Sequence, residues 1–410
     1  MTGPIDRPTL AQPGYRREEL PDPESVGEDE GLVAAIRAEI ETTGPITFAR
    51  FMERALYEPG HGYYRRPEAG PGIAGDFLTA PEAHPIFGAA IGRLLEQAWE
   101  AMGRPSPFTV SEPGAGSGAL AAGLLGGLRD LGSPLLAAIR YRPVELELAR
   151  VAAFRARLAG EGLDGYVEAG DLPEGPVETG AVVANEVIDA LPVHRVVGRQ
   201  GRIRELLVGV ADGGGFESVE GVPTTPALAE RLASEGVTLA DGQAAEVCLA
   251  VDAWLERVVR HLRTGVVVLV DYADEPAALH GPARMTGTLR VFARHAVGAD
   301  PFRHVGRQDL TATVDLGAVR VAAIRAGLHP LGETTQAELL AAVGSVELTD
   351  AWLRRPGADL QGALLLRSAV ARLMDPHGMG GYRVLVFGRG LPTGMTLPGL
   401  ARTRRPGSPS

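Results

Sequence analysis

Short apolar runs alternate with longer amphipathic segments through the middle of the chain. Apolar residues at helical spacing occur near 118–131, 147–160 and 245–262, and strand-like apolar runs occur at 108–112, 139–145, 166–170, 180–186 and 265–271. A strand, a helix and a second strand form a βαβ unit, and repeated units build a mostly parallel sheet with helices on both faces. The pattern therefore predicts an α/β protein.

Flanking segments add elements to this core. Apolar spacing predicts a helix at 31–40 and a second helix that starts after Thr47, whose hydroxyl suits an N-cap. The residues 193–210 are typical of a β-hairpin, and 334–373 is apolar and helical. A last strand-like run lies at 382–387.

We expect one large domain with an accessory helical part. Its segments are a flexible acidic tail at 1–30, an N-terminal helical region with a candidate binding loop at 31–107, a core with a hairpin insertion at 108–333, a helical insertion at 334–375, the last core strand at 376–390 and a flexible tail at 391–410.

The overall composition disfavours several functions. Of the 410 residues 45% are hydrophobic, so the chain can bury a full core, and the formal net charge of -11 disfavours nucleic-acid binding through phosphate neutralisation. Every apolar run is shorter than the roughly 18 residues that a membrane span needs, so we expect a cytoplasmic protein with no membrane partner. A homodimer is left open.

Disulfide and metal chemistry are not expected either. The single cysteine, Cys248, excludes an intrachain disulfide and a multi-cysteine metal site, which fits a reducing compartment. Four histidines are scattered along the chain without the spacing that is typical of metal ligands: His61, His84, His295 and His304. The sequence therefore predicts no metal.

A glycine turn follows the first core strand. Gly114, Gly116 and Gly118 let the backbone turn sharply and approach a ligand, and the helix that follows offers unpaired N–H groups. The spacing differs from the Gly-x-Gly-x-x-Gly of dinucleotide sites, and Glu112 just before the turn would repel a pyrophosphate. A ligand with an ammonium and a sulfonium cation suits this acid, and S-adenosylmethionine is such a ligand.

Two more acids are candidate cofactor contacts. Glu145 ends the next predicted strand, where an acid can accept hydrogen bonds from ribose hydroxyls, although it could also cap the following helix. Asp171 follows the predicted strand at 166–170, where adenine contacts often lie, and a loop or cap role fits it as well.

A second polar group, Asn185, Glu186 and Asp189, lies at the end of the strand predicted at 180–186. Open α/β sheets bind ligands at this carboxyl edge. Carboxylates in apolar surroundings need cations or hydrogen-bond donors, whereas the alternative role is a helix cap closed by Asp189. Asn185 is the only asparagine in a sequence without lysine, which favours a functional role.

These motifs, in this order, resemble the MidA-like methyltransferases. The matching segments are 44–48, 57–64, 75–82, 86–88, 112–118, 184–192, 270–272, 288–290, His295, 309–312 and 335–336. The resemblance covers most of the chain from about 44 to 389. It implies a Rossmann-like class I sheet with N-terminal helices and a helical insertion, and S-adenosylmethionine-dependent methylation of a protein arginine.

The resemblance also implies roles for single residues. The methionine part of the cofactor would contact Glu112 and the three glycines, and the ribose would contact Glu145. The acceptor side would be lined by four polar residues, Asp76, Asn185, Glu186 and Asp189. Asn185 would also face the cofactor.

We expect Glu186 to hold the acceptor guanidinium, because a carboxylate can accept two hydrogen bonds from it. Asp76 or Asp189 would handle the proton. Tyr63 and Tyr64 could close over the acceptor, although core packing fits them equally well.

The sequence departs from the family where the acceptor is expected. Val187 and Ile188 stand where aromatic residues are usual, and Ala273 stands in place of a glycine. Methylation of a small molecule therefore stays open, as does an assembly factor that only binds the cofactor.

Overall fold

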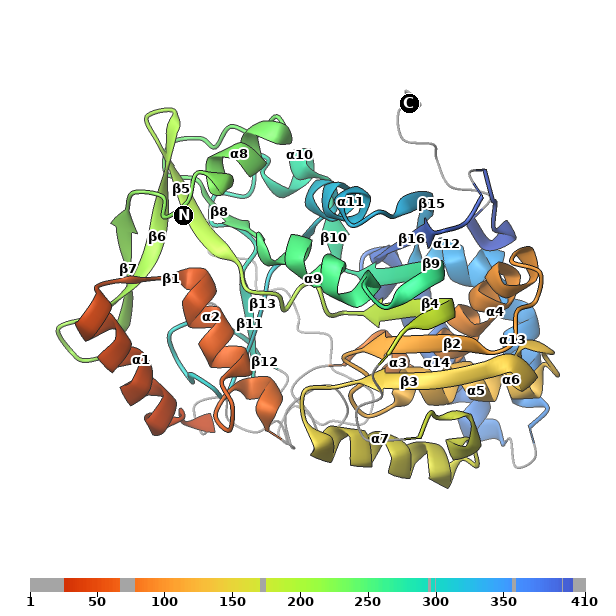
Figure 1. The fold of residues 1–410 in the computed structure, drawn as a ribbon. Helices are drawn as coiled ribbons and strands as arrows, with labels where there is room; N and C mark the ends of the chain where they lie inside the picture. The colour runs from red at the N-terminus through yellow and green to blue at the C-terminus, as the bar shows by residue number, and fades with distance from the viewer. Residues whose placement is uncertain are drawn as a thin grey trace, which may run out of the picture.

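A six-stranded sheet forms the centre of the structure, a computed structural model that describes residues 26–66, 78–169, 175–293, 296–298, 300–355, 359–392 and 394–400 (Figure 1). The strands lie in the order β15 (His329–Thr335), β16 (Arg383–Arg389), β9 (Leu262–Asp271), β4 (Val177–Asn185), β2 (Phe108–Pro113) and β3 (Ile139–Val144). Neighbours from β9 to β3 run parallel, and β16 runs antiparallel to both adjacent strands. The sheet is therefore mostly parallel, as predicted.

The chain reverses direction across this sheet at β2. After β2 it forms β3 on one side, and then returns to form β4 on the other side. In open α/β sheets, ligands bind outside the carboxyl ends of strands at such a switch point. This topology positions the candidate site.

Two apolar clusters cover the two faces of the sheet. On β9, Val266, Val268 and Val270 pack into one cluster, whereas Val267 and Leu269 pack into the other. Successive side chains of a strand point to opposite faces, so a continuous apolar run is what a strand covered on both faces requires.

Helices complete both clusters. The first contains residues of α4 (Ile86–Ala101), α5 (Ala119–Asp130), α6 (Leu135–Ala138), α7 (Leu148–Gly160), α12 (Gln336–Ala342), α13 (Ser345–Leu353) and α14 (Leu360–Met374). The second contains residues of α9 (Ala250–Val259) and α11 (Leu316–Arg325). Shorter helices are α3 (Ala80–Ala83), α10 (Pro276–Leu279), and the 3-10 turns η3 (Asp164–Tyr166), η4 (Met379–Gly381) and η5 (Pro398–Leu400).

A second sheet lies beside the core, with α1 and α2 packed near β6 and β7 (Figure 1). Its strands are β1 (Ile46–Thr47), β6 (Arg202–Val210), β5 (His194–Arg199) and β8 (Ala244–Val247), with β7 (Phe216–Gly221) paired to β6. The helices here are α1 (Glu30–Thr43), α2 (Phe48–Tyr57), η2 (Tyr63–Arg65) and α8 (Ala227–Ser234). Small sheets join β12 (Ala296–Gly298), β11 (Arg290–Ala293) and β13 (Asp309–Thr311), and pair β10 (Ala273–Asp274) with β14 (Val314–Asp315).

Most predicted elements are confirmed. Thr47 caps α2 by accepting a hydrogen bond from the backbone N–H of Arg50 at 3.0 Å, and the hairpin at 193–210 forms as β5 and β6. Among the described residues, no helix is both long and apolar enough to cross a membrane.

Two predicted elements are wrong. In place of a strand at 166–170, the described residues form the turn η3 and a single bridge from Val167 to Tyr141. In place of a helix from 245, the residues Ala244–Val247 form β8, because Ala245 and Val247 alternate into an apolar cluster with Val196 of β5. The sequence analysis also missed β15, whose Pro330 and Gly332 are unusual in a strand.

Helices α4 and α5 pack closely through glycines. A Cβ on Gly123 would lie 2.7 Å from the carbonyl oxygen of Pro85, and one on Gly88 would lie 2.7 Å from the carbonyl oxygen of Leu120. Both obstacles are backbone atoms, so these positions require the absence of a side chain.

We therefore predict that Gly123→Ala lowers the free energy of unfolding by about 1–3 kcal/mol, because the added methyl forces the helices apart. Gly126→Ala on the same helix is the matched control, since its Cβ would meet only the Arg355 side chain at 3.5 Å. The control should be neutral or stabilising by up to about 1 kcal/mol. Equal effects of the two variants in denaturant unfolding would contradict the close-packing argument.

Candidate functional site

The carboxyl edge of the parallel strands gathers most of the predicted site. The glycine turn follows β2, Glu145 follows β3, Asn185 ends β4 and Asp271 ends β9. Parallel strands bring their carboxyl ends to one edge, so these groups, separated along the chain, become neighbours. Asp76 and Asp171 lie outside the described residues.

The glycine turn has a left-handed backbone conformation at each of its three glycines. Gly114, Gly116 and Gly118 all have positive φ, at 68°, 53° and 80°. A Cβ on Gly118 would lie 3.0 Å from Phe154 and from Leu158 of α7, so the turn lies directly against that helix. Side chains larger than hydrogen would be strained here by both conformation and contact.

Glu145 lies beside this turn. Its carboxylate accepts a hydrogen bond from the backbone N–H of Gly116, while its other oxygen accepts from Leu146 at 3.2 Å. Glu145 does not cap the following helix, because α7 begins at Leu148 with Glu147 as its N-cap, and the predicted ribose contact stays a prediction.

Glu112 lies beneath the turn and is 4% exposed. The Tyr141 hydroxyl donates a hydrogen bond of 2.6 Å to it. Burial, with a smaller contribution from Glu145, raises the pKa of Glu112 to about 8 despite that hydrogen bond. Glu112 is therefore positioned by Tyr141 from the adjacent strand.

Helix α3 covers the glycine turn from outside. The Ser117 hydroxyl of the turn donates to Glu82 of α3. Arg157 of α7 donates to Ser117 at 2.9 Å and lies 3.3 Å from Glu82. The turn is thus held between two helices by a polar triad that the sequence analysis did not identify.

Directly after β4, Glu186 has a constrained backbone and specific hydrogen-bond donors. Its φ is +50°, which is rare for a residue with a side chain, and its N–H donates to Val270 at 2.8 Å. Its Oε1 accepts hydrogen bonds from the Asn185 amide at 3.0 Å and from the Ala80 N–H at 3.2 Å. The side chain remains partly exposed.

Asp271 organises the loop that follows Glu186. Its Oδ2 accepts from the N–H groups of Ile188 at 3.0 Å and of Asp189 at 3.2 Å, and its Oδ1 accepts from that of Tyr272 at 2.9 Å. Asp271 and Asp189 are both buried. The sequence analysis missed Asp271, although its place at the end of a predicted strand is the same signal that pointed to Glu186.

The pKa values of these three carboxyl groups are all raised, chiefly by burial. Burial first, and then the neighbouring Asp189, raise the pKa of Glu186 to about 8. Burial raises the pKa of Asp189 to about 6, and burial with both neighbours raises that of Asp271 well above its usual range. Among the described residues, no arginine or histidine forms an ion pair with any of the three.

Several polar atoms near these acids have no partner. Asn185 Oδ1, Asp189 Oδ1 and the Tyr272 hydroxyl are buried without a hydrogen-bond partner among the described residues. Buried polar groups are nearly always hydrogen-bonded, because an unmade bond costs about 1–3 kcal/mol. The arrangement therefore indicates a place for polar ligand groups.

The two predicted tyrosines, Tyr63 and Tyr64, lie on η2 and pack against neighbouring side chains. Tyr63 is 0% exposed and belongs to the apolar cluster around α2, so it packs in the interior of this structure. Tyr64 donates to Asp309 at 2.8 Å and stacks at 5.6 Å on Tyr57, whose hydroxyl donates to the carbonyl of Ala190 at 2.9 Å. Tyr57 is another contact that the sequence analysis missed.

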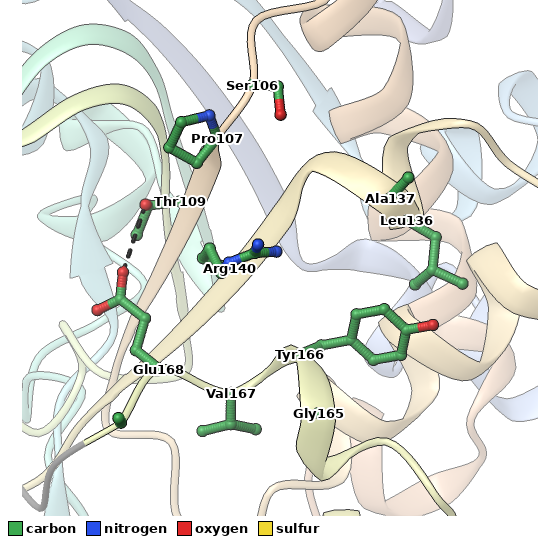
Figure 2. A pocket seen from close by; sticks show the side chains of 11 residues that line it. Ser106, Pro107, Thr109, Leu136, Ala137, Arg140, Gly165, Tyr166, Val167 and Glu168 are labelled. Carbon is green, nitrogen blue, oxygen red and sulfur yellow. Dashed lines mark hydrogen bonds between the residues drawn. The ribbon is translucent and has the colours of Figure 1, made fainter.

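A separate hollow of about 910 Å³ lies near the amino ends of β2 and β3, away from these strand ends (Figure 2). Thr109, Arg140 and Glu168 are among its lining residues, and the Thr109 hydroxyl donates to Glu168 at 3.5 Å. None of the predicted site residues lines it. The size of this hollow is not evidence of a function, so the carboxyl edge with its polar groups stays the candidate site.

Comparisons with known proteins agree with this geometry. A family model described as "Putative S-adenosyl-L-methionine-dependent methyltransferase" matches residues 90–334. The mitochondrial protein arginine methyltransferase NDUFAF7 homolog of Drosophila melanogaster is 30% identical, over 92% of this chain and 90% of its own length. The mitochondrial protein arginine methyltransferase NDUFAF7 of Mus musculus is 27% identical, over 85% of this chain and 79% of its own.

A crystal structure gives the same result. A Burkholderia thailandensis protein bound to S-adenosyl-homocysteine has a TM-score of 0.83 and 35% identity, covering 94% of this chain and 98% of that chain. The family resemblance found from the motifs is thus confirmed, together with the cofactor. The chain belongs to this family and is an S-adenosyl-L-methionine-dependent methyltransferase.

Proposed function

We propose that this enzyme is a class I, Rossmann-like methyltransferase that methylates an arginine side chain in a protein. One observation carries the proposal. Three acids, Glu186, Asp189 and Asp271, lie together at the carboxyl edge of the sheet, and among the described residues none of them forms an ion pair with a cationic side chain. The two mitochondrial relatives are named as protein arginine methyltransferases, which supports the same acceptor.

The class I assignment is supported by the strand order. Parallel strands on both sides of β2 place its carboxyl end at the switch point, and the antiparallel β16 lies between β9 and β15. The glycine turn then follows the first strand of the sheet, where a nucleoside ligand binds in doubly wound folds.

The residues at this edge fit S-adenosylmethionine. Bound there, the cofactor supplies an electrophilic methyl group on a sulfonium. The glycine turn would hold its methionine part, with Glu112 beneath, and Glu145 would accept hydrogen bonds from its ribose. The unpartnered Asn185 Oδ1 can accept a hydrogen bond from the cofactor, while the Asn185 amide holds Glu186. Asp171 is the proposed adenine-side contact.

The acid group fits a guanidinium. Arginine stays charged at all relevant pH values and presents five N–H donors in a planar fork, which a carboxylate can bind through two hydrogen bonds. Glu186 is partly exposed and already positioned by Asn185 and Ala80, so it can receive the acceptor. Holding the acceptor nitrogen about 3 Å from the methyl group is the main requirement of the displacement.

The proton released on methyl transfer needs an acceptor close by. Asp189, whose pKa is near 6, is one candidate, and Asp76 is the other. For substrate contact we propose Tyr64, which is partly exposed and donates a hydrogen bond to Asp309. Tyr63 would have to move out of the apolar interior to reach a substrate.

Compartment and assembly stay predictions. The expected cytoplasmic location has no direct support, since the two curated relatives are named as mitochondrial proteins. Protein substrates as the partners, a homodimer, and the lack of a nucleic-acid partner are likewise proposals from the sequence.

Radiolabelled methyl transfer to a cell lysate tests the acceptor class. We expect the label in the protein fraction and, after acid hydrolysis, in methylated arginine. Label confined to small molecules would overturn the protein substrate. Tight cofactor binding with no transfer to either fraction would favour an assembly factor.

We predict that Glu186→Gln leaves affinity for S-adenosylmethionine within about twofold but reduces turnover by about 10² to 10⁴, because the amide cannot balance the guanidinium charge. Glu178→Gln is the matched control, as this exposed acid lies at the amino end of the same strand and pairs with the exposed Arg263. Unaltered turnover in the first variant would remove Glu186 from the mechanism.

The raised pKa values predict proton release on substrate binding. Glu186, with a pKa of about 8, must lose its proton to bind a cation, so affinity for an arginine peptide should rise with pH by up to about tenfold per unit from pH 6 and level off above pH 8. Calorimetry in buffers of different ionisation enthalpy measures the released proton. A flat affinity and no buffer dependence would show that Glu186 is already ionised.

A further inference from the structure

A second group of ionisable side chains lies away from the cofactor turn and the acceptor acids. Glu235 follows α8, His280 follows α10 and Asp315 caps the start of α11. Each offers a ligand atom, and these atoms all lie within 4.8 Å of one another. Figure 1 shows the three helices along one side of the molecule, where the second sheet meets the core.

The group contains unsatisfied polar atoms. Both carboxylate oxygens of Glu235 are buried and have no hydrogen-bond partner among the described residues. Asp315 uses Oδ1 to accept from the Ala318 N–H at 3.1 Å, which leaves Oδ2 facing His280 Nε2 at 3.4 Å. Two carboxylates thus converge on one imidazole.

Arg231, a cation close to Glu235, only partly offsets this charge. Arg231 lies on α8 and lowers the proton affinity of Glu235 only weakly, because its guanidinium forms an ion pair with Asp252. Its Nη1 is buried without a partner. When both carboxyl groups are ionised and His280 is neutral, Arg231 therefore leaves negative charge at this cluster unbalanced.

Backbone contacts fix two of the three groups, His280 and Asp315, in place. The carbonyl of His280 accepts a hydrogen bond of 3.0 Å from the buried Gln243 side chain, and its N–H donates to Pro276 at 2.9 Å. Asp315 lies in β14, which pairs with β10. A ligand set positioned in this way needs little reordering on binding an ion.

We propose that Glu235, His280 and Asp315 bind a divalent transition-metal ion, for which zinc is the best match. One imidazole nitrogen and two carboxylate oxygens are ligands that Zn²⁺ accepts, and a water can complete the coordination. The ion joins α8, which packs on the second sheet, to α11, which packs on the core, and to the residue that follows α10.

The site also connects to the acceptor region. Val314, next to Asp315, donates its N–H to the carbonyl of Tyr272 at 3.1 Å. An ion that fixes Asp315 therefore supports the strand that holds Tyr272 beside Asp189 and Asp271. The expected role is structural, since the metal ligands include none of the proposed catalytic residues.

A shared proton is the competing explanation. Burial and the adjacent Asp315 raise the pKa of Glu235 to about 8, so a proton between the two carboxyl groups could replace the ion. Glu235→Gln separates these explanations, because glutamine imitates the protonated acid in shape and charge but loses the carboxylate ligand.

The full chain, without a histidine tag, is stripped with a chelator and titrated with zinc by calorimetry. We expect one zinc per chain, a higher melting temperature with zinc, and at least tenfold weaker binding in Glu235→Gln. The variant should melt in its metal-free form close to the metal-free parent, which shows that it is folded.

His261→Gln controls for binding by exposed histidines, since His261 lies on the surface after α9. It should keep the stoichiometry of one and the parent affinity. Either no zinc binding by the parent chain or equal binding by Glu235→Gln would overturn the site and favour the shared proton. Manganese in a parallel titration should bind more weakly than zinc.

Discussion

The structure depends on three carboxyl groups crowded together at the carboxyl edge of its sheet, Glu186, Asp189 and Asp271. One oxygen of Asp271 accepts hydrogen bonds from the N–H groups of Ile188 and Asp189 in the loop after β4. The other accepts from the N–H of Tyr272, the residue after β9. These bonds hold Glu186 and Asp189 close to Asp271, where burial disfavours their ionised forms. Under the proposed function, a cationic acceptor bound here would favour the ionised forms again, with release of the proton of Glu186.

The glycine turn and the loop after β4, which form the two halves of the proposed active site, are held together by shared contacts. A Cβ on Gly114 of the cofactor turn would lie 3.2 Å from Val187 of the acceptor loop. Helix α3 contacts both halves, because its Ala80 N–H donates to Glu186 while its Glu82 accepts from Ser117. Methyl transfer depends on the distance between donor and acceptor, so these shared contacts matter more than any single catalytic group.

The sequence predicted the elements with strong local signals. Buried strands such as β9 and the cap at Thr47 follow from side-chain periodicity and hydroxyl chemistry, and acids at strand ends marked the site. The sequence could not show that Asp271 binds the neighbouring loop, because that contact spans 82 residues. The Ala244–Val247 segment shows the same limit, since its pairing with β5 decides between strand and helix.

The two acid groups differ in how their charge can be balanced. Glu186 remains partly exposed at the sheet edge, where a guanidinium can arrive and leave during turnover. The oxygens of Glu235 are shielded from water, and a buried histidine faces the same point. A transient cation suits the first group and a resident ion suits the second, because exchange with solvent requires access. Glu186 and Glu235 are both partly exposed as residues, so the shielded oxygens of Glu235 are what distinguish the proposed ion site from the proposed substrate site.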